Sequence, residues 1–425
     1  MSLLGEERGG CFLSCSTACR IAETYFYGGI AQLVERLVRN EKARGSNPLT
    51  STKYFSMPNQ FVPDNLRTWA VIDLVALRHN VSRIRERIGP AVGILSVVKA
   101  NAYGHGASRV AGVLAEETSI FGVANLREAE ELAPVPRGRD LMLLSPCLPG
   151  ERRDAVRRGH IVTVSSAVEA AAYASFGAVR VNFKIDTGMG RVGCSFDSAN
   201  DEAIRLKGVA GVEVHSISTH LPSADEDDAF TASQLESFSK LAAELRGYFP
   251  KAKLHAHNSA GVLTQGVHAM EIARPGLLLY GVSPLPDFQG DFQPVMEWKT
   301  RVALVREMPA GSGFSYGRTF VSDAPLRTAV IPVGYADGFP RQVSGNGAAV
   351  LIRGVRCPLL GRVTMDQVIV DVSGVDGVSE GDVVTLFGRD GGEEIAVTEL
   401  AQRAGTIPWD ILTGIGRRVE RFYRG

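Results

Sequence analysis

The feature that most constrains the fold is an alternation of short apolar segments with amphipathic ones, which begins at residue 69. The segment GILSVV (93–98) is apolar almost throughout, as expected of a strand that is buried on both faces. Before it, apolar residues recur at spacings of four, three and four, which predicts a helix with one buried face. These residues are Leu77, Val81, Ile84 and Ile88. Similar strands are expected at 69–73, 120–125, 141–145, 161–165, 179–186, 212–220 and 253–257. About eight strands that alternate with helices predict an α/β fold, a (β/α)8 barrel of the TIM type.

The pattern changes near residue 295, where short strands are separated by turns that contain Gly, Pro and Asp. VALVREMPAG and TAVIPVGYADG are two of these segments, and they are typical of a β-rich domain. A length of 425 residues exceeds the usual limit for one hydrophobic core, so two domains are expected. We predict a barrel domain over 57–294, whose first residues could instead join the other domain, and a β-rich domain over 295–425. Near the end, LAQRAGTIPWDILTGIG has a helical pattern that Pro408 interrupts.

The first 56 residues lack this alternation. The stretch 28–52 resembles the conceptual translation of a transfer-RNA gene, in which IAQLVER and RGSNP recur. An amphipathic helix is the structural alternative, with Ile30, Leu33, Val34 and Leu37 on its apolar face. We interpret residues 1–56 as a spurious or disordered N-terminal extension and Met57 as the start of the protein.

Composition excludes several classes of function. The formal net charge is zero and no basic stripe is visible, so neither nucleic acid nor an acidic membrane surface is an expected partner. No apolar run is long enough to cross a bilayer or to serve as an export signal, and we expect a cytoplasmic protein. Three of the six cysteines, Cys11, Cys15 and Cys19, would line one helix face, but no His or fourth Cys completes a metal site. No bound metal is predicted.

A lysine directly follows one of the buried strands. Lys99 comes after GILSVV, and catalytic groups of barrels lie at the C-terminal ends of strands. Burial disfavours the charged form of an amine, and a neutral amine can form a Schiff base. The alternative is an ammonium group that reaches water at the rim, and from the residues alone the two interpretations are equally favoured.

Motifs around this lysine and further along the chain resemble those of one family. The segment KANAYGHG (99–106) is similar to the cofactor-lysine motif of the alanine racemases, which are fold-type III pyridoxal-phosphate enzymes. Further matches occur in order at KIDTGMGRVG, STHLPSADE, HNSAG, ARPGLLLYG, GSGFSYGRTF, VGYADGFPR and GRVTMDQ. The ordered set covers residues from about 69 to 425 and is far more specific than any single match.

The resemblance implies a set of cofactor ligands. Lys99 would hold pyridoxal 5'-phosphate through a Schiff base, and Tyr103 would help to hold the phosphate. The other implied phosphate ligands are Ser259, the backbone amides of Gly276 and Leu277, and the nearby Tyr280. Backbone donors that approach a phosphate closely need a residue without a side chain, which explains a glycine at 276. Tyr280 could equally be a core aromatic.

Arg274 matches the arginine that faces the pyridine nitrogen of the cofactor. A guanidinium is always protonated, so it donates a hydrogen bond and cannot give the ring a full proton. The cofactor then remains a weak electron sink, which restricts the chemistry to proton exchange at one carbon. His220 matches the histidine that supports this arginine. A surface salt-bridge partner and a core histidine are the structural alternatives for the two, and His215 is expected to be such a core histidine.

Arg191 matches the residue that contacts the phenolic oxygen of the cofactor and the carboxylate of the substrate. Lys184 lies seven residues earlier, and in many family members the matching lysine is carbamylated. A carbamate would convert a cation into an anion that positions Arg191. The alternative, a plain Lys–Arg neighbourhood, would bring like charges together in a buried site.

Racemisation requires one base on each face of the α-carbon. Lys99 would serve one face, and Tyr316 matches the tyrosine that serves the other. A phenol has a reference pKa of about 10 and needs cationic neighbours to act as a base, for which His220 and Arg274 are candidates. In the family this tyrosine comes from the partner subunit of a homodimer. The same holds for Tyr335, which would gate entry, and for Met365 and Asp366, which would contact the substrate.

One position departs from the family. The tyrosine whose hydroxyl contacts the phosphate is replaced by Trp409 in TIPWD. Indole offers an N–H donor but no hydroxyl, and it is bulkier, so the affinity for the cofactor is expected to differ more than the reaction.

The resemblance therefore predicts an isomerase that interconverts L- and D-alanine and supplies D-alanine for peptidoglycan. A racemase of broader amino-acid specificity is the alternative. A related decarboxylase shares the architecture, but Arg274 argues against it because those enzymes use an acidic partner for the pyridine nitrogen. A non-catalytic cofactor-binding protein would have the barrel alone, without the domain that carries Tyr316.

Overall fold

A computed structural model of the chain describes residues 63, 65–135, 138–265 and 270–425. The interpretation of residues 1–56, with the cysteines at 11, 15 and 19, lies outside these ranges. Across the described residues, no helix is long and apolar enough to span a membrane. In the same part of the chain, no group of three or more His, Cys, Asp or Glu side chains could hold a metal ion.

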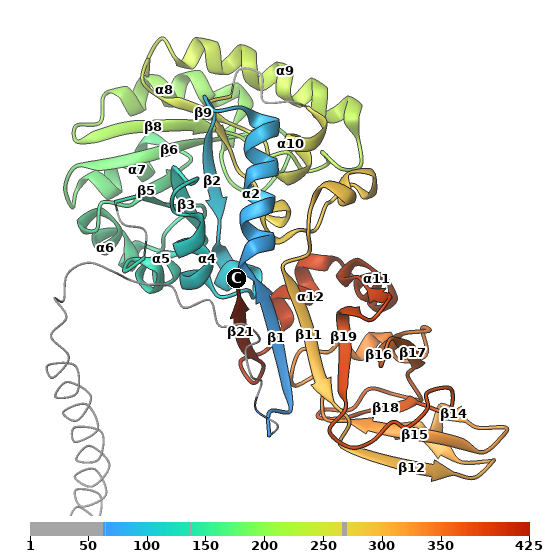
Figure 1. The fold of residues 1–425 in the computed structure, drawn as a ribbon. Helices are drawn as coiled ribbons and strands as arrows, with labels where there is room; N and C mark the ends of the chain where they lie inside the picture. The colour runs from blue at the N-terminus through green and yellow to red at the C-terminus, as the bar shows by residue number, and fades with distance from the viewer. Residues whose placement is uncertain (1–62, 64, 136–137, 266–269) are drawn as a thin grey trace, which may run out of the picture. The chain divides into compact units, whose positions relative to one another are not determined.

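The first large element is a nearly closed parallel barrel surrounded by helices, so the predicted fold class is confirmed (Figure 1). Its strands follow the order β10-β2-β3-β4-β5-β6-β8-β9. Their bounds are β2 (Gly93–Val97), β3 (Ile120–Val123), β4 (Asp140–Leu143), β5 (Ile161–Val164), β6 (Val179–Asp186), β8 (Val212–Ser218), β9 (Lys253–His255) and β10 (Ile272–Ala273). The short β7 (Cys194–Ser195) pairs with the end of β6. Backbone hydrogen bonds from Glu271 to Leu254 and from Arg274 to His257 join β10 to β9.

The outer helices bury one face each against these strands. They are α2 (Leu74–Ile88), α4 (Ala107–Leu114), α5 (Leu126–Leu132), α6 (Arg152–Arg157), α7 (Ala167–Ala174), α8 (Ala199–Lys207), α9 (Asp228–Leu245) and α10 (Ser259–Thr264). The four apolar residues predicted to form the buried face of α2 are all buried. Asp73 begins this helix, because its carboxylate accepts hydrogen bonds from the amides of Val75 and Ala76 at 2.9 Å. Gly89 ends it at a φ of 77°.

The segment 69–73 forms a strand as predicted, but the prediction that it is one of the eight barrel strands was wrong. It lies instead in the β-rich domain, which was the alternative for the first residues. This strand, β1 (Thr68–Asp73), pairs antiparallel with β11 (Met296–Arg301) and parallel with β21 (Glu420–Arg424), in the sheet of the β-rich domain. The eighth barrel strand is β10 instead. It has two residues, too few for any periodicity to appear in the sequence.

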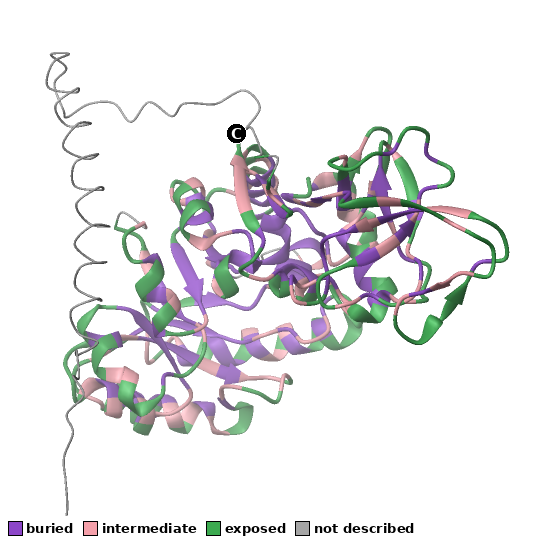
Figure 2. Cartoon of the chain, turned by 90° about the horizontal axis from the view of Figure 1, so that it is seen from below, coloured by how far each residue is buried: buried purple, intermediate pink, exposed green. Residues whose placement is uncertain are grey.

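The β-rich domain contains two larger sheets and a small hairpin (Figure 1). One sheet has the order β17-β16-β19-β11-β1-β21, with β20 on β19, and the other has the order β12-β15-β18. The bounds are β12 (Leu304–Met308), β13 (Gly313–Phe314), β14 (Phe320–Val321), β15 (Leu326–Ile331), β16 (Ala349–Ile352), β17 (Val355–Pro358), β18 (Val368–Asp371), β19 (Val383–Asp390) and β20 (Glu393–Ile395). Trp298 lies at the centre of the core and packs edge-on against Phe339 and Phe387. Figure 2 shows buried strands within each domain.

The C-terminal segment joins this domain to the barrel. Two helices, α11 (Val397–Ala404) and α12 (Pro408–Gly414), replace the single interrupted pattern, and Pro408 begins the second one, where a missing N–H is tolerated. A Cβ atom on Gly104 would collide with the carbonyl oxygen of Leu412 in α12. Arg421 donates from Nε to the Gly104 carbonyl at 3.1 Å. The turn that follows Lys99 is therefore packed against the end of the chain.

Candidate active site

Lys99 begins a left-handed turn, α3 (Lys99–Tyr103), directly after β2. The residues from Ala100 to Tyr103 all have φ between 51° and 54°, although none is glycine. A left-handed conformation costs roughly 1–2 kcal/mol for each such residue. Side chains compensate the exposed backbone amides: Glu128 accepts from Ala100, and Asn101 accepts from Ala107, both at 2.9 Å. Backbone strain that is held in place by its surroundings is concentrated at functional sites.

The amines and guanidiniums near Lys99 form a cluster of positive charge. Burial lowers the pKa of Lys99, and the nearby Arg191 lowers it further, whereas Glu128 opposes the shift. Lys184 lies on β6, and burial together with Arg274 and Arg191 holds its pKa well below the usual range for a lysine. Both amines are therefore driven toward their neutral, nucleophilic form.

Asp186 places the loop that carries Arg191. The carboxylate of Asp186, at the end of β6, accepts hydrogen bonds from the amides of Gly188, Met189 and Arg191 at 2.8–2.9 Å. Asp186 was not among the predicted site residues, although a carboxylate at the end of a strand, followed by two glycines within four residues, is a recognisable turn signal.

Arg274 follows β10 and is buried, and it pairs with no acid among the residues that the structure describes. Its guanidinium donates to the carbonyls of Thr219, His255 and Ala256 at 2.8–3.0 Å. It also lies 2.6 Å from Nδ1 of His255 and 3.2 Å from Nδ1 of His220. Because a guanidinium can only donate, both imidazole nitrogens must accept. Burial lowers the pKa of Arg274 to about 10, which leaves it charged near neutrality.

The two histidines beside Arg274 are held neutral. Burial and the charge of the neighbouring Arg274 lower the pKa of His220 to about 2. The same causes hold the pKa of His255 well below its usual range. The expectation that His220 could serve as a cationic neighbour of Tyr316 was therefore wrong, because its Nδ1 lone pair accepts from Arg274. His255 was missed, although two histidines in the strand end KLHAH were the available signal. His215, which was expected to be a core histidine, is only half-buried, and it is among the groups that lower the pKa of His255.

The residues expected at a phosphate lie together at one side of this cluster. The hydroxyl of Ser259 accepts from the Gly276 amide at 3.0 Å and from the Leu278 amide at 3.4 Å. Leu277 begins a short 3-10 helix, η3 (Leu277–Tyr280). A Cβ atom on Gly276 would lie 2.6 Å from the Tyr103 hydroxyl. The predicted closeness of Gly276, Ser259 and Tyr103 is thus present.

Tyr280 and Trp409 support the Tyr103 ring from two elements. The ring centroids of Tyr103 and Tyr280 are 4.8 Å apart, and the Tyr280 hydroxyl donates to the Val97 carbonyl at 2.9 Å. That hydroxyl is thus committed to the backbone, which agrees with the alternative of a core aromatic. Burial raises the pKa of Tyr103 to about 12, and a hydrogen bond with the Trp409 side chain opposes the rise.

The residues expected from a partner subunit lie on exposed loops of the β-rich domain. Tyr316, in η5 (Tyr316–Arg318), is 71% exposed, and its neighbours Ser315 and Arg318 have φ values of 59° and 47°. Tyr335 and Met365 are 43% and 51% exposed. None of the contacts found among the described residues joins these side chains to Lys99 of the same chain. The structure thus separates the predicted site residues into two groups, one in each domain.

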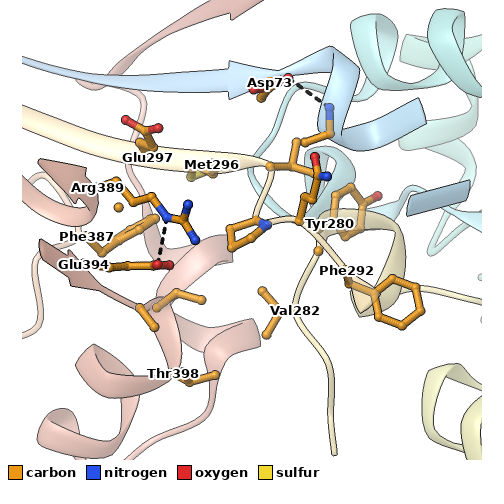
Figure 3. A pocket seen from close by; sticks show the side chains of 18 of the residues that line it. Asp73, Tyr280, Val282, Phe292, Met296, Glu297, Phe387, Arg389, Glu394 and Thr398 are labelled. Atoms are coloured by element: carbon orange, nitrogen blue, oxygen red, sulfur yellow. Dashed lines mark hydrogen bonds and ion pairs between the residues drawn. The ribbon is translucent and has the colours of Figure 1, made fainter. Parts of the chain in front are cut away.

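The cavity drawn in Figure 3 is a different place. It has a volume of about 660 Å³ and is lined by parts of both domains, among them Asp73, Tyr280 and Arg389. Its charged groups are already paired: Asp73 with Arg424 at 2.9 Å, and Arg389 with Glu394 at 2.8 Å. Tyr280 is the one predicted site residue that lines it. The cationic cluster around Lys99 is therefore the better candidate for chemistry.

This cluster fits an anionic ring cofactor that carries a phosphate. Arg274 is a buried donor that pairs with no acid among the described residues, and a side chain at position 276 would collide with the Tyr103 hydroxyl. Glu128 is the acid that raises the pKa of Lys99, and Asp186 is the acid that raises the pKa of Lys184. A phosphate and a carboxylate would supply the missing negative charge.

Two family models match most of the chain. The model of the alanine racemase N-terminal domain matches residues 72–284, and that of the C-terminal domain matches residues 295–423. The alanine racemase of Citrifermentans bemidjiense is 40% identical over 380 residues, which cover 85% of this chain and all of that protein. The alanine racemase of Halothermothrix orenii is 37% identical and covers 84% of this chain and 97% of its own length.

Solved structures of such enzymes have the same fold. The alanine racemase of Streptomyces coelicolor superposes with a TM-score of 0.78 at 35% identity, covering 85% of this chain and 98% of that one. A structure of the Bartonella henselae alanine racemase with covalently bound pyridoxal phosphate superposes with a TM-score of 0.76 at 28% identity. That match covers 84% of this chain and 99% of the other.

Proposed function

Because the chain belongs to the alanine racemase family, we propose that it interconverts L- and D-alanine with pyridoxal 5'-phosphate. We further propose that Lys99 and Tyr316 are the two bases, and that the product supplies peptidoglycan synthesis from the cytoplasm. The observation that carries the proposal is the buried Arg274, whose partners are three carbonyls and two neutral imidazoles.

Arg274 supports racemisation over other reactions of this cofactor. Pyridoxal phosphate, when bound, acts as an electron sink that acidifies the α-hydrogen of an attached amino acid. A guanidinium in a cage of acceptors keeps its own protons, so it would hydrogen-bond to the ring nitrogen without protonating it. The lone pairs of His220 and His255 fix the plane of the guanidinium. Tyr103, Ser259 and the amides near Gly276 would hold the phosphate.

Lys99 is suited to take and return a proton on one face of the substrate. Its burial and the charge of Arg191 lower its pKa, so the amine is available in the neutral form that can attack a carbonyl or accept a proton. The left-handed turn fixes the position from which it acts. Arg191, on the loop held by Asp186, would bind the substrate carboxylate.

Tyr316 would serve the other face from a partner subunit in a homodimer. Its exposure of 71%, the strained residues on either side, and its separation from Lys99 in one chain support this assignment. Of the two cationic neighbours expected for this phenol, His220 is neutral and only Arg274 carries a charge. Tyr335, Met365 and Asp366 would come from the same partner.

Lys184 is a candidate for carbamylation. A neutral amine can add to carbon dioxide and release one proton, which gives a carbamate with a negative charge. That charge would face Arg274 and Arg191, the two cations that now lower the pKa of Lys184. Intact-mass and ¹³C measurements in labelled bicarbonate should detect one carbamate per chain, and Lys184→Ala should remove it. A holoenzyme without the added mass would contradict the modification and leave the racemase proposal intact.

The test of the proposed function is solvent deuterium uptake at the α-carbon of L- and D-alanine. We expect the wild type to exchange the α-hydrogen of both enantiomers. Lys99→Ala and Tyr316→Phe should each abolish abstraction of the α-hydrogen chiefly from one enantiomer. The exposed Lys251→Ala and the half-buried Tyr248→Phe, both on the barrel exterior, are matched controls. Equal residual exchange of both enantiomers in Tyr316→Phe would contradict the two-base assignment. Comparable turnover of serine or lysine would favour the broader racemase.

A further inference from the structure

Two loops of the β-rich domain behave as one structural unit. The first carries Tyr335, and the second carries Thr364 and Met365. The amide of Tyr335 donates to the Thr364 carbonyl at 3.1 Å, and the amide of Ala336 donates to the Met365 carbonyl at 3.0 Å. A Cβ atom on Gly334 would collide with both of these carbonyl oxygens, so only glycine permits the approach.

Arg418, in the segment between α12 and β21, forms ion pairs with both loops of this unit. Its Nη1 donates to the carboxylate of Asp366 at 2.7 Å and lies 3.5 Å from the carboxylate of Asp337. Asp337 is 4% exposed, and its other oxygen accepts from the Gly334 amide at 3.0 Å. The amide of Gly416 also donates to the Asp337 carbonyl at 2.8 Å. One guanidinium thus bridges an acid from each loop.

The charge of Asp366 makes this bridge relevant to binding. An unpaired carboxylate next to the Met365 amide would repel an incoming substrate carboxylate, and like charges brought together at an interface are unfavourable. Asp366 is 53% exposed, so the repulsion would be screened only in part by water. The guanidinium of Arg418 cancels this charge and fixes the direction of the side chain.

We propose that Arg418 is a positioning residue for the carboxylate end of the substrate. It holds the Tyr335 and Met365 loops in one arrangement and neutralises Asp366, so that the partner subunit's active site receives a hydrogen-bond donor without an uncompensated negative charge. The proposal rests on the proposed function, in which these loops complete the site of the other subunit.

The chain supplies a matched control in the neighbouring residue. Arg417 is also exposed, and it takes part in no hydrogen bond or ion pair within the ranges that the structure describes. Arg417→Gln removes the same charge from the same segment, so it separates the effect of the Arg418 contacts from that of net charge.

The experiment measures kcat and KM for alanine in the holoenzyme dimer. We expect Arg418→Gln to lower kcat/KM by about fivefold, mainly through KM, as befits a partly exposed ion pair. Arg418→Lys should recover part of this loss, and Arg417→Gln should match the wild type. The dimer mass and the absorbance of the bound cofactor should be unchanged in all three variants.

A double substitution separates the electrostatic role from a merely structural one. In an Asp366→Asn background there is no charge to neutralise, so adding Arg418→Gln should change kcat/KM by less than about twofold. The same loss in both backgrounds, or an unchanged KM in Arg418→Gln, would overturn the proposal. Absence of racemisation in the wild type would instead refute the proposed function, so the two failures are distinguishable.

Discussion

The close approach of Gly276 to Tyr103 gives a sharp prediction about cofactor affinity. In Gly276→Ala the new Cβ atom would lie 2.6 Å from the Tyr103 hydroxyl, a distance that real Cβ contacts essentially never show. Tyr103 is 7% exposed and packs on Tyr280, so it cannot swing aside freely. Overpacking of this kind typically costs about 1–3 kcal/mol.

Two of the proposed phosphate ligands are displaced by this change, so we expect the cost to appear in cofactor binding. A loss of about 1.4 kcal/mol of binding free energy corresponds to a tenfold larger dissociation constant. We therefore predict that Gly276→Ala binds pyridoxal phosphate about tenfold more weakly, measured by titrating the apoenzyme and following the absorbance of the cofactor. Gly290→Ala is the control, because its Cβ atom would meet nothing within 4 Å.

A second background tests the stated cause. Tyr103→Phe removes the oxygen that the new Cβ atom would strike, so the effect of Gly276→Ala on affinity should shrink to less than about threefold in that background. An equal effect in both backgrounds, or wild-type affinity in Gly276→Ala alone, would refute the reasoning.

Two further predictions concern stability. Gly104→Ala should lower the free energy of unfolding by about 2 kcal/mol more than Gly138→Ala, measured with urea, because both have φ near 80° but only Gly104 abuts Leu412; similar losses would show that the contact is unimportant. His220, with a folded pKa of about 2, stays neutral while the unfolded chain takes up a proton below its reference pKa of about 6.5. The unfolded state then binds more protons, so stability of the apoenzyme should fall as the pH drops from 6.5 toward 5, above the range where most carboxylates titrate. The slope should decrease in His220→Gln, and an unchanged slope would contradict the assignment of a neutral His220.

The sequence was informative wherever a local pattern carries the structure. The spacing of Leu77, Val81, Ile84 and Ile88 predicted α2, and the ordered motifs led to the residues that we propose to act with Lys99. The predicted barrel and the predicted β-rich C-terminal part both agree with the structure. The helices and strands depend on contacts between residues that are close in the chain. The position of Lys99 follows from the rule that catalytic groups of barrels lie at the C-terminal ends of the parallel strands.

Other features depend on tertiary contacts and could not be read in this way. The left-handed turn from Ala100 to Tyr103 contains no glycine, and its local preference opposes the conformation that Glu128 and Arg421 help to hold. The place of β1 in the sheet of the β-rich domain depends on its pairing with β21, about 350 residues later in the chain. The bridge from Arg418 to Asp366 joins positions 52 residues apart, and no spacing rule indicates it.

The central claim is that each active site combines Lys99 of one subunit with Tyr316 of its partner, and mixed dimers test it most directly. Lys99→Ala and Tyr316→Phe homodimers should each have little activity. After the two variants are unfolded together and refolded, random pairing makes half of the dimers mixed, and each mixed dimer contains one intact site. We therefore predict recovery of about a quarter of the wild-type alanine racemisation. If the mixture remains as inactive as the separate variants while mixed dimers are detected by mass, both bases belong to the same chain and the account is wrong.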